Sequence, residues 1–228
     1  MSSKRYKKLP EKTKDSNAEP IEKLLPELKK NCTTKFDESL DLSFQINHKQ
    51  KKSEVNIRTV VNLPGGTGKK VKVAVVCESN KEKEAKDAGA DIVGGDEFVE
   101  RIKGGELNFE KLIGTPGMMI KLSKLGKVLG PKGLMPNPKL GTVTMDVSQA
   151  VKSAKSGEVQ FRVEKSGIVH AGIGKSSFDE KSIIENVKAF IKAVSVAKPS
   201  GSKGVYMKKI TLSSSMGPGV KIDTMGVV

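Results

Sequence analysis

Residues 62–77 read NLPGGTGKKVKVAVVC, and the strand pattern of the chain changes within them. The run VKVAVVC at 71–77 is apolar on both faces of a strand, which is typical of a parallel strand covered by helices on each side. Residues 39–46 and 159–164 instead alternate between apolar and polar side chains, as antiparallel strands with one solvated face do. The sequence therefore predicts two different kinds of sheet, separated by a glycine-rich connection.

These patterns predict one α+β domain that is interrupted by a second domain. Residues 1–64 and 158–228 are expected to form an antiparallel sheet with helices, built from both ends of the chain. Residues 65–157, in which strands and helices alternate, are expected to form an inserted α/β domain with a three-layer, Rossmann-like arrangement. Glycines at the two crossings suit a hinge, although tight turns alone would also explain them. The predicted hinge residues are Gly65, Gly66, Gly68 and Gly157.

Two local patterns add detail to the domain built from the chain ends. After residue 164 the letters KSG predict a turn, and the following IVHAGI would run back beside residues 159–163 as a hairpin. Ser177 and Glu180 have the spacing of a capping box and predict a helix that extends to about Val194.

The charge of the chain points to a polyanionic partner. Its 228 residues hold 41 Lys and Arg against 26 Asp and Glu, a formal net charge of +15. Such an excess favours nucleic acid, whose counterions are released on binding, with an anionic membrane as the rival partner. Against a membrane, no apolar run approaches the roughly 20 residues of a spanning helix. The start, MSSKRYKKLPEKTKD, also lacks the apolar segment of a secretory signal.

Neither an enzyme nor a metalloprotein is predicted. Cys32 and Cys77 stand without partners at metal-ligand spacing, and they suit two reduced thiols of a cytoplasmic protein. The segment GTGKK at 66–70 resembles a phosphate loop, but Leu63 stands where that loop needs its first glycine and Lys70 where it needs Ser or Thr. No catalytic set of side chains is recognisable. A nucleotide-binding enzyme or switch that uses this Gly-Lys connector is the alternative class, and no cofactor or metal is expected.

One stretch inside the predicted insertion is rich in lysine and has no acidic residue. Residues 125–139 read LGKVLGPKGLMPNPK, and no Asp or Glu occurs between Lys111 and Met145. Because leucines are interspersed with lysines, glycines and prolines, we expect a rigid, partly packed loop that displays ammonium groups to a polyanion. Its cations are Lys121, Lys124, Lys127, Lys132 and Lys139.

Two segments of the other domain have the chemistry of an RNA contact. SSSMGPGVKID at 213–223 combines hydroxyls, an unbranched Met and a stiff turn whose backbone a folded RNA can approach; a plain C-terminal turn is the alternative. In TTKFDES at 33–39, the Phe36 ring could stack on RNA or belong to the core. Arg162 and Lys165 bracket the predicted turn and could pair with phosphates.

The ordered blocks of this sequence resemble the family of the ribosomal stalk protein L-one, in its bacterial or organellar form. They extend from about Lys35 to Asp223, and among them are KFDES, NLPGGTGK, AGADIVGGDEFVERI, TPGMM, LGKVLGPKGLMPNPK, GTVT, VQFRVEKSGIVHAGIGKSSFDE and SSSMGPGVKID. The resemblance implies a protein of two domains, the second inserted into the first, that binds the stalk helices of large-subunit rRNA beside the exit site. It also implies repression of the protein's own operon through an mRNA that mimics the rRNA site.

Carried over residue by residue, the resemblance implies an RNA site in the domain built from the chain ends. The family motifs give Lys35, Phe36, Ser39, Lys165, Ser215, Met216 and Gly217, and Arg162, His170 and Lys175 are added from the same blocks. Ser215 stands where many members have Thr, which keeps the hydroxyl. Residues 170–175 read HAGIGK where many members read HVPIGK.

Together these inferences predict an RNA-binding constituent of the large ribosomal subunit in the cytoplasm, without enzymatic activity, membrane contact or an obligate homo-oligomer. Its expected partners are the rRNA stalk, the tRNA in the exit site and its own operon mRNA. The lysine stretch is predicted to assist the release of deacylated tRNA, because phosphate-directed lysines bind without reading sequence and release readily. Packing of this stretch on further rRNA is the alternative.

Overall fold

The computed structural model describes residues 6, 18–47, 57–105, 107–164, 166–199 and 205–223. The chain forms two compact units, Met1–Gly68 with Val159–Val228, and Lys69–Glu158. We call them the end-built unit and the inserted unit. One contains an antiparallel sheet and the other a parallel sheet, so the predicted mixture of the two sheet types is confirmed.

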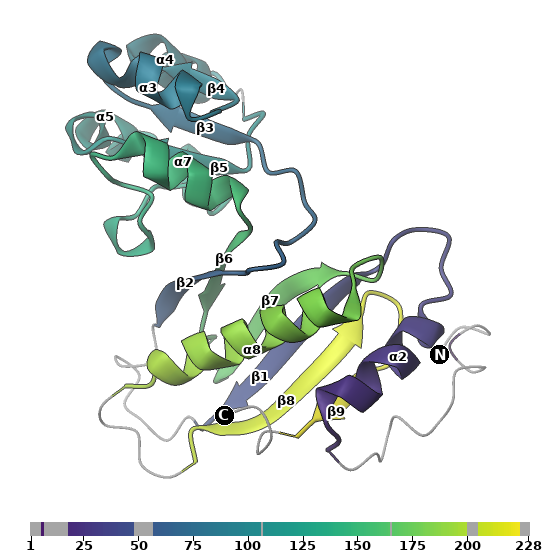
Figure 1. Cartoon of the computed structure of the whole chain (residues 1–228). Coiled ribbons are helices and arrows are strands. Elements are labelled where there is room, and N and C mark those ends of the chain that lie inside the picture. Colours follow the sequence, from purple (N-terminus) through teal and green to yellow (C-terminus); the bar gives the residue numbers. More distant parts are fainter. Residues whose placement is uncertain are drawn as a thin grey trace. The chain divides into compact units, whose positions relative to one another are not determined.

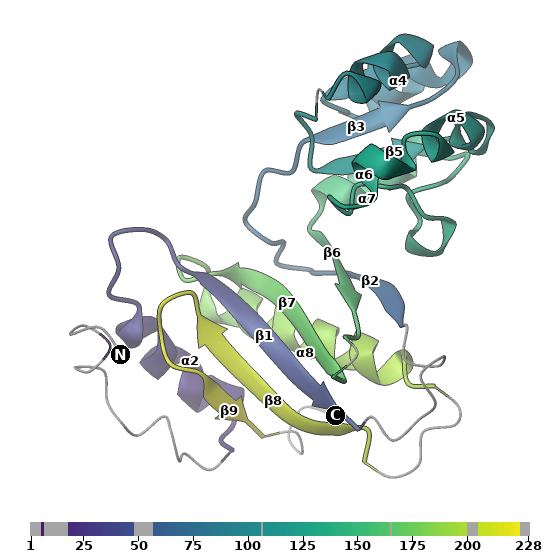
Figure 2. The same cartoon turned by 180° about the vertical axis from the view of Figure 1, so that it is seen from behind.

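The end-built unit contains a four-stranded antiparallel sheet in the order β7-β1-β8-β9. Its strands are β1 (Ser39–Ile46), β7 (Ile168–Lys175), β8 (Met207–Ser214) and β9 (Val220–Ile222). β1 lies between β7 and β8, with Ser39 opposite Lys175 and Leu40 opposite Ser214. The start of β1 therefore lies at the end of the sheet where both neighbouring strands finish (Figure 2).

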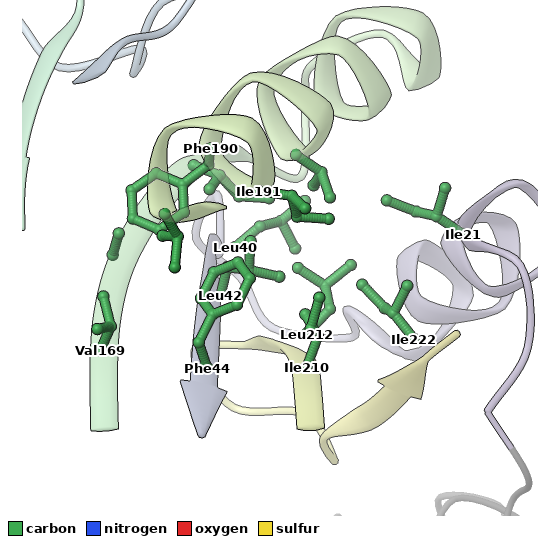
Figure 3. Packing of buried hydrophobic residues seen from close by; sticks show 14 of the residues in the cluster. Ile21, Leu40, Leu42, Phe44, Val169, Phe190, Ile191, Ile210, Leu212 and Ile222 are labelled. Carbon is green, nitrogen blue, oxygen red and sulfur yellow. The ribbon is translucent and has the colours of Figure 1, made fainter. Parts of the chain in front are cut away.

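Alternation along β1 gives this sheet one buried face. Leu40, Leu42 and Phe44 are fully buried, whereas Asp41 between them is exposed on the opposite face. Helices α8 (Glu180–Val196) and α2 (Ile21–Asn31) cover the buried face, as Figures 1 and 2 show. In Figure 3 the ring of Phe190 in α8 stacks on Phe44, with centroids 5.4 Å apart. Each such buried side chain stabilises the unit by roughly 1.5–3 kcal/mol.

The inserted unit contains a three-stranded parallel sheet in the order β4-β3-β5. Its strands are β3 (Val73–Val76), β4 (Ile92–Gly94) and β5 (Lys111–Gly114). All four side chains of β3 are buried, Ala74 and Val76 in one apolar cluster and Val73 and Val75 in another. The run VKVAVVC thus forms the covered central strand that its composition predicts.

Helices supply part of each apolar cluster. Phe98 and Ile102 of α4 share a cluster with Ala74, whereas Ala85 of α3 and Val151 of α7 share the other with Val73. The helices of this unit are α3 (Glu82–Asp87), α4 (Asp96–Lys103), α5 (Met119–Ser123), α6 (Gly126–Leu129) and α7 (Val147–Lys155), with 3-10 turns η2 (Ser79–Lys81), η3 (Pro116–Met118) and η4 (Pro138–Leu140). Helices, sheet and helices therefore form three layers in this unit.

The predicted hairpin that begins at residue 159 is wrong for its strands and is confirmed only at its turn. β6 (Glu158–Arg162) pairs with β2 (Arg58–Asn62) in a separate two-stranded sheet, whereas β7 pairs with β1. Within the part of the chain that the structure describes, an isolated bridge between Val163 and Val169 and a 2.9 Å hydrogen bond from the Glu164 N–H to the Ile168 carbonyl join the two sides of the turn. Alternation identifies a half-buried strand but not its partner, and β7 pairs with β1, with one register shift between Leu40 and Asp41.

The predicted capping box is wrong as well. α8 begins at Glu180 with Asp179 as its N-cap residue and without a capping side-chain hydrogen bond. The hydroxyl of Ser177 instead donates to Oδ2 of Asp37 over 2.8 Å. The spacing of Ser177 and Glu180 was therefore a coincidence, and Ser177 serves a contact with the segment before β1.

Candidate nucleic-acid interface

Three segments meet at one end of the four-stranded sheet. Residues 34–39 lead into β1, residues 175–177 end β7 and follow it, and residues 214–217 do the same for β8. They come together because antiparallel pairing puts the start of β1 beside the ends of its two neighbours. The Ser39 N–H donates to Oγ of Ser215 over 3.1 Å, and the Ser215 N–H donates to the Ser39 carbonyl over 3.0 Å. We call these three segments the sheet-end surface.

A buried carboxylate lies beneath this surface. Glu38 is 0% exposed, and its carboxylate accepts hydrogen bonds from the Thr34 hydroxyl at 2.9 Å and the Met216 N–H at 3.1 Å. Its carbonyl oxygen accepts the Ser176 N–H at 2.8 Å. Burial alone would raise the pKa of the Glu38 carboxyl, but the adjacent Ser214 hydroxyl, the Thr34 hydroxyl and the Met216 N–H hold that pKa below its ordinary value. One residue therefore bonds to all three segments.

A second carboxylate joins the segment before β1 to the segment after β7. Asp37 accepts the Ser176 hydroxyl at 2.8 Å, the Ser177 hydroxyl at 2.8 Å and the Ser177 N–H at 3.1 Å. The Lys175 ammonium lies 3.8 Å from the same carboxylate. The hydroxyls of Ser177 and Ser176 lower the pKa of the Asp37 carboxyl. Both acids of KFDES thus act as acceptors for neighbouring parts of the protein.

Two large apolar side chains project from this bonded framework. Phe36 is 55% exposed and Met216 is 52% exposed, and they belong to segments that Glu38 connects. The exposed Lys35 precedes Phe36. Of the two fates that the sequence allowed for Phe36, the structure shows the exposed one. An exposed ring and thioether beside an ammonium group can stack on a base or sugar and pair with a phosphate.

In the turn after β8, a side chain at Gly217 would force the Ser214 hydroxyl to move. A Cβ there would lie 2.3 Å from Oγ of Ser214, closer than real atoms approach. The Gly217 N–H donates to the Ser214 carbonyl over 3.3 Å, which closes the turn. Glycine therefore keeps Met216 and Ser215 on a tight bend at the protein surface.

The structure brings some predicted RNA-site residues together and separates others. Arg162 is exposed on β6 in the two-stranded sheet, and His170 is exposed within β7, opposite Ser43 rather than Ser39. Lys165 lies outside the described residues. The predicted residues within the sheet-end surface are Lys35, Phe36, Ser39, Lys175, Ser215, Met216 and Gly217.

Sequence reasoning missed the polar residues that hold this surface together. Acids and small hydroxyls usually occupy solvated positions, so the sequence did not predict a structural role for Glu38, Asp37 or Thr34. Ser176 was missed for the same reason. The one signal was two adjacent acids inside a basic and aromatic segment that is otherwise suited to bind a polyanion.

The lysine-rich stretch of the inserted unit is partly helical and partly packed. It contains α6 and η4, and Leu125 and Leu129 are buried. Lys121 forms an ion pair with Asp96 of α4, 2.5 Å from Nζ to Oδ1. An acidic side chain from another segment therefore lies beside a stretch that has no acidic residue of its own. The ammonium-bearing residues Lys121, Lys124, Lys127, Lys132 and Lys139 are all exposed.

The glycine-rich connector, residues 65–68, is packed within the end-built unit. Gly68 has a φ of +69°, and a Cβ there would lie 2.8 Å from the Phe178 ring. Asn186 of α8 holds the backbone of Gly65 and Gly66. At the second crossing Gly157 has a φ of +99°, a conformation that favours glycine. Three of the four predicted hinge glycines, Gly66, Gly68 and Gly157, therefore have a positive φ.

Metal sites, reactive thiols and membrane-spanning helices were also considered for the described residues. Across these ranges no group of three or more His, Cys, Asp or Glu side chains could hold a metal ion. Burial raises the pKa of the Cys32 and Cys77 thiols, which lowers their reactivity. No helix in the described part of the chain is long and apolar enough to cross a membrane.

Comparison with known proteins extends over most of the chain. A family model described as the ribosomal protein L1p/L10e family matches residues 28–218. The chain is 65% identical over 223 residues to the large ribosomal subunit protein uL1 of Pelagibacter ubique (strain HTCC1062), and the match covers 97% of each chain.

Proposed function

The chain belongs to the ribosomal protein L1p/L10e family, and from this membership and the geometry above we propose that its sheet-end surface binds large-subunit rRNA. It is a structural protein of the large subunit of cytoplasmic ribosomes and not an enzyme. The observation that carries the proposal is the exposure of Phe36 and Met216 beside Lys35 on a tightly bonded framework.

The chemistry of this surface suits a folded RNA. A ring and a thioether supply apolar contact to splayed bases or sugars, and Ser215 supplies a hydroxyl for sugar edges. Lys35 and Lys175 supply charge for phosphates. Residues 1–60 and 159–228 together hold 25 basic against 14 acidic side chains, a net charge of +11, which would attract RNA toward this unit. The site within the rRNA is, in this proposal, the mobile stalk beside the exit site.

Crosslinking tests the proposal on the full chain. Ultraviolet crosslinks between the protein and rRNA in assembled large subunits should map to residues 34–39 and 214–217. Stalk nucleotides should be recovered on the RNA side. Crosslinks confined to the inserted unit would contradict the assignment of rRNA to the sheet-end surface.

The same surface is proposed to recognise the mRNA of the protein's own operon. Among its described residues the end-built unit offers one turn with these hydroxyls and this exposed Met, so one surface would serve both RNAs. Repression by feedback requires that rRNA binds more tightly than the mRNA does. A competition titration should show rRNA displacing the mRNA, and a complex that holds both RNAs at once would contradict the proposal.

The lysine-rich stretch is proposed to assist the release of deacylated tRNA. The exposed ammonium groups of Lys124, Lys127 and Lys132 suit weak contacts to phosphates, and such contacts break readily. Packing of this stretch against additional rRNA is the competing possibility. Exit-site occupancy in translating ribosomes distinguishes the two, as set out in the Discussion.

A nucleotide-binding switch is the second class of function. It would need the backbone of residues 65–68 to bind phosphates. The Asn186 side chain already hydrogen-bonds to the Gly65 N–H and the Gly66 carbonyl, and the Phe178 ring lies close to Gly68. Equilibrium dialysis should therefore detect no binding of ATP or GTP. Stoichiometric binding of either nucleotide would revive this alternative.

A further inference from the structure

We propose that Glu38 is the positioning residue of the sheet-end surface: from a buried place it aligns the Met216 backbone with the segment that carries Phe36. The proposal rests on the RNA-binding function proposed above. Glu38 itself is 0% exposed and would not touch RNA. Its effect would pass through the two segments that its carboxylate joins.

The carboxylate suits this role because it only accepts hydrogen bonds. The Thr34 hydroxyl donates to Oε1 and the Met216 N–H donates to Oε2, so each oxygen faces a donor from a different segment. An ionised carboxylate accepts at both oxygens, whereas an amide accepts at one and donates at the other. A Gln side chain of the same shape would turn its NH₂ group toward the Thr34 hydroxyl, which can accept, and would leave the Met216 N–H with a neutral acceptor in place of a charged one.

Core stability alone does not explain a carboxylate at this position. Burial of a charge is costly unless hydrogen bonds compensate it, and an apolar side chain of similar volume would usually stabilise a core equally well. Glu38 lies two residues after the exposed Phe36, and its carboxylate accepts the N–H of the exposed Met216. What the carboxylate adds over an apolar residue is directional contact with the Thr34 hydroxyl and with the Met216 backbone.

The other charged groups nearby do not replace it. Asp37 bonds to Ser176 and Ser177, on the side of β7, and Lys175 lies near Asp37. Lys29 of α2 donates to the Phe178 carbonyl. Among the hydrogen bonds and ion pairs of the described residues, Glu38 is the acid that contacts the Met216 backbone.

The first test needs no RNA. Glu38→Gln should accelerate hydrogen exchange of the Met216 amide by roughly tenfold or more, because that N–H loses a charged acceptor. Glu158→Gln is the matched control, since the Glu158 side chain is 14% exposed and pairs with Lys111 of the inserted unit at 2.7 Å. It should leave exchange at Met216 unchanged. Equal exchange in Glu38→Gln and the wild type overturns the proposal.

The second test measures binding to a transcript of the rRNA stalk. Glu38→Gln should bind roughly ten- to a hundredfold more weakly, the range expected when a buried donor or acceptor loses its partner. The slope of log affinity against log salt should match the wild type, because no phosphate contact is removed. A fall in slope by about one unit would mean that Glu38 acts on a phosphate contact and would overturn the positioning role.

A second pair of variants covers the case in which Glu38→Gln fails to fold. Thr34→Val removes one donor to the carboxylate, whereas Thr34→Ser keeps it. Weaker RNA binding by Thr34→Val with recovery in Thr34→Ser supports the proposal, and equal binding by both variants overturns it. If the wild type does not bind the transcript, the proposed function fails, and hydrogen exchange at Met216 still decides the role of Glu38.

Discussion

Oδ1 of Asn186 lies 2.8 Å from the backbone nitrogen of Gly65, and Nδ2 of the same side chain donates to the Gly66 carbonyl at 3.0 Å. Nδ2 also donates to the Ile173 carbonyl at 2.8 Å. The fully buried amide therefore bonds the connector to α8 and β7 at once. Without it, three backbone groups would lose their partners.

Asn186→Ala should lower the free energy of unfolding of the end-built unit by about 2–4 kcal/mol, because those backbone groups lose their hydrogen bonds and a cavity forms. Urea denaturation followed by hydrogen exchange within β1 measures this. Asn62→Ala, at an exposed position on β2, is the control and should change stability little. Equal stability of the two variants would show that the hydrogen bonds of Asn186 do not stabilise the unit.

The hydrogen bonds of Asn186 with Gly65 and Gly66 also affect the position of the predicted hinge. Because Gly65 and Gly66 are bonded to α8, motion at the first crossing should be concentrated after Gly68, near Lys69 and Lys70. Backbone NMR relaxation should show Gly65 as ordered as α8 and residues 69–70 less ordered. In Asn186→Ala the order at Gly65 should fall. High mobility at Gly65 in the wild type would restore the original hinge assignment.

Phe36→Ala should weaken rRNA binding by about 1–3 kcal/mol, the scale of one lost stacking contact. Because the ring is 55% exposed, the free energy of unfolding should barely change. Filter binding and urea denaturation measure the two quantities. Val196→Ala at the end of α8, where the side chain is 77% exposed, is a matched control that should affect neither. A loss of stability equal to the loss of affinity would mean that Phe36 supports the fold instead.

Replacing Lys127 and Lys132 with Gln should leave affinity for the isolated rRNA stalk nearly unchanged and slow the release of tRNA from the exit site. The reason is the exposure of both ammonium groups in the inserted unit, on a different unit from the sheet-end surface. Exit-site occupancy in a translation assay provides the measurement. Lys121→Gln should have a smaller effect, since Lys121 is already paired with Asp96. Lost stalk affinity with normal tRNA release would assign the stretch to rRNA.

Acid should destabilise the end-built unit partly through Glu38. Its pKa in the folded protein lies below the ordinary value of 4.5, so the folded state binds its proton less readily than the unfolded chain. The resulting stability is present above about pH 4.5 and is lost as the pH falls through the folded pKa. Urea denaturation between pH 7 and pH 3 should show a shallower loss in Glu38→Gln than in the wild type. Parallel curves would exclude Glu38 as a source of the acid sensitivity.

The sequence predicted those parts of the fold in which a single segment carries its own pattern. Alternation marked β1, and the doubly apolar run marked β3, because each pattern directly records which faces are buried. The partner of β7 was missed, since pairing depends on strands far apart in the chain. The ion pair of Lys121 with Asp96 was missed for the same reason.

The sequence likewise predicted some residues of the candidate site and missed others. Met216 was predicted because an unbranched apolar side chain is unusual in a solvated turn, whereas Phe36 was assigned to the site through the family motif. Glu38 was not found, because a carboxylate looks the same in sequence whether it is solvated or buried. Its role depends on where residues 214–217 return in space, and one-dimensional patterns do not contain that distance.

The meeting of the segment before β1 with the turn after β8 also sets an order of events during synthesis. The ribosome makes Phe36 early, but Met216 emerges only after the whole inserted unit and α8. A nascent chain therefore lacks the completed surface for most of its elongation. Fragments released between Lys139 and Ser214 would carry the lysine-rich stretch without the sheet-end surface, so under the proposed function they would not compete with the finished protein for rRNA.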